Sequence, residues 1–65
     1  MIDIDSQIKC VEREISMRNR MYPQWVARKT MTQGKADAEL LAMTAVLHTL
    51  KVVKKREDPQ ASLLG

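Results

Sequence analysis

Apolar residues recur in both halves of the chain at alternating spacings of four and three residues. The first series contains one arginine and ends in two aromatic residues: Ile4, Ile8, Val11, Ile15, Arg18, Tyr22 and Trp25. The second series is Ala36, Leu40, Met43, Leu47, Leu50 and Lys54. Because an α-helix has about 3.6 residues per turn, this spacing places the members of each series on one helix face. The sequence therefore predicts two amphipathic helices and no β-strand.

The boundaries of these helices carry helix-capping residues. Asp3 is suited to cap the first helix, and Thr32 the second. The chain turns over residues 29–32, and helices joined by so short a turn lie antiparallel. Asp58-Pro59 ends the second helix. The predicted fold is an all-α antiparallel helical hairpin, formed by a domain at 1-58, with a mobile tail at 59-65.

Two residues interrupt the first series. Pro23 lacks a backbone N–H and disfavours helical geometry at Tyr22, so the first helix is expected to kink or to stop near Met21, with Pro23 opening a further turn. Arg18 occupies a position where an aliphatic residue is expected, and a buried unpaired charge is very costly. Its partner is expected to be Glu14, Glu39 or a ligand, and we favour a structural ion pair.

The second helix carries more apolar surface than one partner helix can cover. A chain of 65 residues has a small core, and with one cysteine it forms no internal disulfide. Each large apolar side chain left in water forfeits about 1.5–3 kcal/mol. We therefore expect a homodimer or larger helical bundle, with an interface at Leu41, Ala45, Val46 and Val53.

The hairpin tip, residues 17–31, combines aromatic and basic residues. It holds the only Trp and the only Tyr and lacks acidic residues, in a chain of net charge +3. Aromatic faces beside arginines bind bases, phosphates or carboxylates. The candidate site is Arg18, Arg20, Tyr22, Trp25, Arg28 and Lys29.

Alternatively, both aromatic residues close the core. The two interpretations agree if Trp25 is buried and Tyr22 lies at the surface. Met17 and Met21 are expected to be adaptable packing residues.

Other function classes receive little support from the sequence. There is no convincing carboxylate pair, no glycine-rich phosphate loop, and one His and one Cys cannot form a catalytic constellation, so we expect no enzyme, cofactor or metal site. Nucleic-acid binding is disfavoured because the net charge is modest and no recognition-helix motif appears. The N-terminal residues do not resemble a signal peptide, and no apolar run is long enough to span a bilayer. The single cysteine suits a reducing cytoplasm, which is the expected location.

Several short motifs resemble one known family. The segment Ile8-Lys9-Cys10-Val11-Glu12-Arg13-Glu14-Ile15, the motif Met17-Arg18-x-Arg20-x-Tyr22-Pro23-x-Trp25-Val26, and the later Met31-Thr32, Ala36, Glu39-Leu40, Met43 and Leu47-x-Thr49-Leu50 are similar to short hypothetical proteins of proteobacterial phages and prophages. The likeness covers roughly residues 7–51. Members often carry Gly about where Lys29 stands, so a left-handed residue here would be strained by about 1–2 kcal/mol.

The resemblance implies a phage origin more than an activity. Small phage proteins without catalytic sites commonly act by binding. The expected function is therefore that of an accessory protein that binds a host protein. Two alternatives stay open: sequestration of a small anionic ligand, such as a nucleotide signal, at the tip, and weak DNA or RNA binding.

Overall fold

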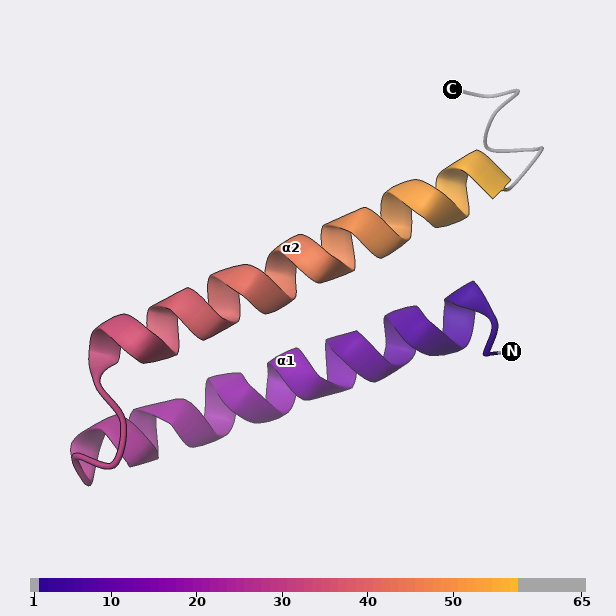
Figure 1. Ribbon diagram of the computed structural model, residues 1–65. Helices are drawn as coiled ribbons and strands as arrows, with labels where there is room; N and C mark the ends of the chain where they lie inside the picture. The colour runs from indigo at the N-terminus through magenta and orange to yellow at the C-terminus, as the bar shows by residue number, and fades with distance from the viewer. Residues whose placement is uncertain (1, 58–65) are drawn as a thin grey trace.

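Two helices lie side by side and antiparallel in the computed structural model, which describes residues 2–57 (Figure 1). Helix α1 spans Ile4–Ala27 and helix α2 spans Gln33–Glu57. The start of α1 and the end of α2 lie at one end of the molecule, and the connection lies at the other. The predicted all-α antiparallel hairpin is confirmed. The predicted helix end at Asp58-Pro59 and the predicted tail at 59–65 lie outside the described residues.

Side-chain caps define where both helices begin. An Asp3 carboxylate oxygen accepts a hydrogen bond from the Ser6 backbone N–H at 2.9 Å. Hydrogen bonding with the side chain of Ser6, and then with its backbone N–H, lowers the pKa of Asp3 below its ordinary value, because both favour the charged form. At α2, the Thr32 hydroxyl accepts from the Lys35 N–H at 3.1 Å. Both predicted caps are confirmed.

Helix α1 continues through Pro23 and ends four residues later. The predicted alternative in which the helix stops near Met21 is therefore wrong. Proline removes one backbone hydrogen bond, but bonds beyond it hold the last turn, including Arg28 N–H to the Gln24 carbonyl at 3.0 Å. A kink within the continuous helix stays a prediction.

The end of α1 is a Schellman motif. The Lys29 N–H donates to the Val26 carbonyl and the Thr30 N–H to the Trp25 carbonyl, both at 3.0 Å. This pattern requires a left-handed residue, and Lys29 has φ of 61°. Glycine has no steric cost there, whereas a residue with a Cβ is strained by about 1–2 kcal/mol. The chain therefore adopts the strained cap at Lys29.

Both predicted series face the seam between the helices. Among the described residues, the buried apolar ones are Ile8, Tyr22 and Ala36. Most other members of the two series are half-buried: Ile4, Val11, Ile15, Arg18, Leu40, Met43, Leu47 and Leu50. The exceptions are Trp25 and Lys54, which are exposed at the two ends of the seam. The core lies where it was predicted, but few of its side chains are fully buried, as expected for a single layer of contact between two helices.

Candidate functional site

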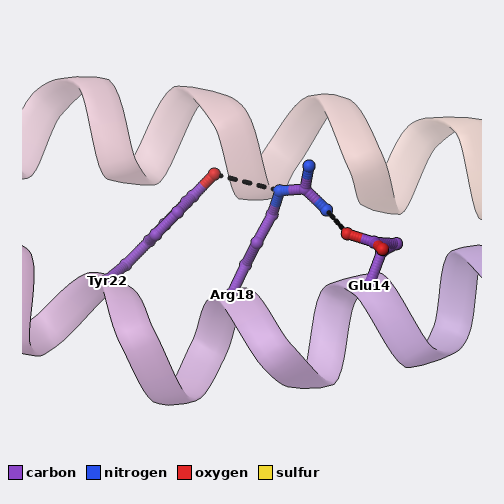
Figure 2. A network of polar contacts seen from close by, with 3 residues as sticks. All are labelled: Glu14, Arg18 and Tyr22. Carbon is purple, nitrogen blue, oxygen red and sulfur yellow. Dashed lines mark hydrogen bonds and ion pairs between the residues drawn. The ribbon is translucent and has the colours of Figure 1, made fainter.

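Arg18 is held within α1 by two side chains of the same helix (Figure 2). One guanidinium N–H lies 2.6 Å from the Glu14 carboxylate, and the Nε–H donates to the Tyr22 hydroxyl at 3.1 Å. The bond to Tyr22, and then that to Glu14, raises the pKa of Arg18. The predicted ion pair with Glu14 is confirmed. This arginine is thus committed to the seam, and its side chain is only 28% exposed.

The burial of the two aromatic residues is the reverse of what was expected. Tyr22 is 6% exposed and Trp25 is 37% exposed. The interpretation with Trp25 buried and Tyr22 at the surface is therefore wrong. Trp25 lies in the last turn of α1, so its ring reaches the edge of the seam. The rings remain in contact, with centroids 5.5 Å apart and planes tilted by 38°.

The basic residues of the tip do not converge on one point. Arg20 precedes Trp25 by five residues, which is about 140° around a helix, so the two project from different faces. Arg28 follows Trp25 by three residues and shares its side of α1. Lys29 follows Arg28 and adopts the left-handed backbone conformation. The predicted site is thus divided: Arg18 and Tyr22 pack in the seam, Arg20 lies apart, and Trp25 and Arg28 are adjacent.

A line of surface residues extends along the Trp25 side of α1. Met17, Met21, Trp25 and Arg28 are spaced by four, four and three residues, and we call them the methionine–tryptophan strip. Met17 is 41% exposed, Met21 is half-buried and Arg28 is exposed. From the sequence, both methionines are predicted to be packing residues. Their helical spacing from Trp25 was the signal that they share its surface.

The two sides of the seam differ in chemistry. One side is bridged by ion pairs, Lys54 with Asp5 at 2.5 Å and Lys51 with Glu12 at 3.9 Å. Both pairs join a lysine of α2 to an acidic residue of α1.

The opposite side is hollowed by an apolar groove of about 520 Å³ that runs between the helices. Its lining is Ile2, Ser6, Gln7, Cys10, Val11, Arg13, Val46 and Leu50. Cys10 and Met17 are seven residues apart, or about two turns, so the methionine–tryptophan strip continues this side of α1.

The four residues predicted to form an interface occupy two surfaces. Val46 lines the apolar groove, and Val53 lines a hollow that shares Ile2 and Leu50 with it. Leu41, at 72% exposure, borders a separate hollow with Asp37 and Thr44. Leu41 precedes Val46 by five residues, which places the two about 140° apart around α2. Ala45, four residues after Leu41, lies beside Leu41 on the side toward Val46. One interface cannot contain all four at its centre.

Comparison of the chain with protein-family models, with curated proteins and with solved structures finds no match. Within residues 2–57, neither helix combines the length and apolar character needed to cross a membrane. The same residues hold no group of three or more His, Cys, Asp or Glu side chains placed to bind a metal ion.

Proposed function

We propose that this chain is a small phage-encoded accessory protein that acts by binding a host protein, without catalysis. The observation that supports binding is the methionine–tryptophan strip. Trp, Met and Arg are enriched at the centres of protein interfaces, and Trp and Arg dominate binding hot spots. Met adapts its shape to a partner surface. The phage origin rests on the resemblance over residues 7–51.

Capture of a small anionic ligand, such as a nucleotide signal, has fewer groups to carry it. The Arg18 guanidinium is already bonded to Glu14 and Tyr22, and Arg20 projects from another face. A phosphate beside Trp25 would have Arg28 and Lys29 as its cations. Nucleic-acid binding has the same shortage of convergent positive charge, since a strong binder neutralises several phosphates at once.

The fold also supports self-association. The core is thin, whereas Ile2 is 67% exposed, Leu41 72% and Val46 46%. Covering such side chains stabilises a fold by about 1.5–3 kcal/mol each, which is large for a domain of this size. We propose a homodimer or higher homo-oligomer as the acting form. We further propose that Pro23 bends α1 and thereby sets the direction of Trp25 and Arg28.

A matched pair of charge reversals tests the strip. Arg28→Glu changes the strip beside Trp25, and Arg20→Glu makes the same chemical change about 140° around α1 from Trp25. The wild-type protein is isolated from host cells, and co-purifying proteins and metabolites are identified by mass spectrometry. Affinity for the purified target is then measured for both variants. We expect Arg28→Glu to weaken binding by at least about tenfold, or about 1.4 kcal/mol, and Arg20→Glu to match wild type.

The outcomes separate the candidate functions. Equal binding by both variants and wild type would show that the strip is not the contact surface. Equal loss in both would point to net charge rather than to a specific contact. Recovery of a nucleotide in place of a protein would favour the anionic-ligand alternative. Helicity and oligomer mass serve as controls, because exposed substitutions change stability by only about 0.5 kcal/mol.

A further inference from the structure

We infer that the apolar groove is the self-association surface, that a second copy of this chain fills it with its own groove, and that the two hairpins lie antiparallel with their tips at opposite ends. This rests on the self-association proposed above and specifies its face and its orientation. The resulting arrangement is an isologous two-fold dimer, a four-helix bundle.

The groove has the composition of half a core. Ile2, Val11, Val46 and Leu50 contribute apolar surface from both helices, together with Cys10. Arg13 is the one charged residue among those that line it, and a long arginine can keep its head in water while its stem is covered. A second groove placed against this one would complete a layer of side chains that a two-helix fold leaves open.

The remaining surfaces fit a second copy less well. The opposite side of the seam carries the Lys51–Glu12 and Lys54–Asp5 pairs, which docking would have to desolvate at a cost. The hollow at Leu41 includes Asp37 and Thr44 in its lining, and all of its lining residues come from α2. The groove is thus the surface to which both helices contribute apolar side chains, with Arg13 as its one charged residue and Ser6 and Gln7 as its other polar ones.

Charge decides the orientation. The tip half, residues 17–38, carries net charge +4 from five basic residues and one acid: Arg18, Arg20, Arg28, Lys29, Lys35 and Asp37. The other half, residues 2–16 and 39–57, carries six basic and six acidic residues and is neutral: Lys9, Arg13, Lys51, Lys54, Lys55, Arg56, Asp3, Asp5, Glu12, Glu14, Glu39 and Glu57. Parallel hairpins would bring two positive tips together. Antiparallel hairpins joined groove to groove hold the two tips at opposite ends of the dimer, which removes that repulsion.

Two glutamate substitutions on α2 test the face. Val46→Glu introduces a charge into the groove, and Leu41→Glu introduces the same charge on the other surface. By sedimentation equilibrium, wild type should have twice the chain mass at micromolar concentration. We expect Val46→Glu to raise the dimer dissociation constant by at least about tenfold and Leu41→Glu to leave it unchanged. The reverse pattern, or a wild-type chain that stays monomeric and folded, overturns the inference.

The distance between labels on the two copies tests the orientation. This measurement introduces no charge into the groove, so it can be made even if Val46→Glu unfolds. In a Cys10→Ala background whose dimer mass is first verified, Gln33→Cys at the tip is spin-labelled and the distance between copies is measured. Helix α1 has 24 residues and is about 36 Å long, so antiparallel tips should be more than about 30 Å apart. A separation below about 20 Å would show parallel hairpins. Arg28 lies outside the groove, so these results are independent of the partner-binding test.

Discussion

The Nε–H of Arg18 donates to the hydroxyl of Tyr22, one helical turn further along α1, at 3.1 Å. This bond satisfies the polar end of a ring that is 6% exposed, and Glu14 pairs with one terminal nitrogen of the guanidinium. A charged residue thereby occupies an apolar position of the seam without an unpaired charge. The arrangement orients the ring that closes the core near the tip.

Removing only the hydroxyl should cost little, whereas removing the ring should cost much. We expect Tyr22→Phe to lower the free energy of unfolding by about 1 kcal/mol, because one hydrogen bond is lost and Glu14 still pairs with Arg18. Tyr22→Ala should lower it by about 3–5 kcal/mol, because a large buried side chain is lost. Urea denaturation followed by circular dichroism measures both. Equal losses in the two variants would show that the hydroxyl, rather than the ring, determines the stability.

Glycine at the left-handed position should stabilise the hairpin. Lys29→Gly removes the steric cost of a Cβ at φ of 61°, and we expect a gain of about 1 kcal/mol. The neighbouring Arg28 has φ of −81°, so Arg28→Gly should instead cost about 0.5–1 kcal/mol while removing the same charge. Thermal melts of both variants make the comparison. A lower melting temperature for Lys29→Gly would argue against a strained cap.

The N-cap of α1 should give the stability an acidic pH dependence. The folded pKa of Asp3 is below its ordinary 3.8, so this contribution is present above the ordinary pKa and is lost as pH falls through the folded value. Asn at this position keeps the acceptor at every pH. We expect the melting temperatures of wild type and Asp3→Asn to differ by a constant amount above about pH 5. Below that pH, the melting temperature of wild type should fall relative to that of Asp3→Asn. A constant difference down to pH 2 would contradict the assignment.

Replacing the proline should stabilise α1 and alter its tip. Pro23→Ala restores a backbone donor to the Asn19 carbonyl and removes the ring clash, for a gain of up to about 3 kcal/mol. Gln24→Ala, at an exposed helical neighbour, should change stability by no more than about 0.5 kcal/mol. If the bend directs Trp25, binding of the target should fall as stability rises. A Pro23→Ala protein no more stable than Gln24→Ala would show that the helix already accommodates proline at no cost.

The parts of the fold that depend on local spacing were predictable. The two series place Ile8 and Leu47 toward the seam because helical periodicity alone determines the inward face. Asp3 and Thr32 were predictable as caps because each side chain bonds a backbone group three residues away. The Arg18–Glu14 pair follows from the same short-range geometry, at a separation of four residues.

The features that depend on the relation between the helices were not predictable. Periodicity places Val46 and Leu41 about 140° apart around α2, but it does not show along which flank of the seam the apolar groove forms. The ion pairs that close one side join residues 39 and 49 positions apart, and their side depends on the register of the two helices. Whether Tyr22 or Trp25 is buried depends on where the seam ends, because both positions fit the same series.

One side of the seam is ion-paired and the other is an apolar groove, so the two sides of the hairpin are not equivalent. This difference determines the handedness of the bundle that two hairpins form. Two antiparallel hairpins can be combined into four-helix bundles of opposite topology, in which each connection turns to the left or to the right when viewed from outside. Only one of these has the grooves of both copies inside and the Lys54–Asp5 pairs outside. The placement of a few ion pairs on one flank would therefore select between two mirror-related orders of the same four helices.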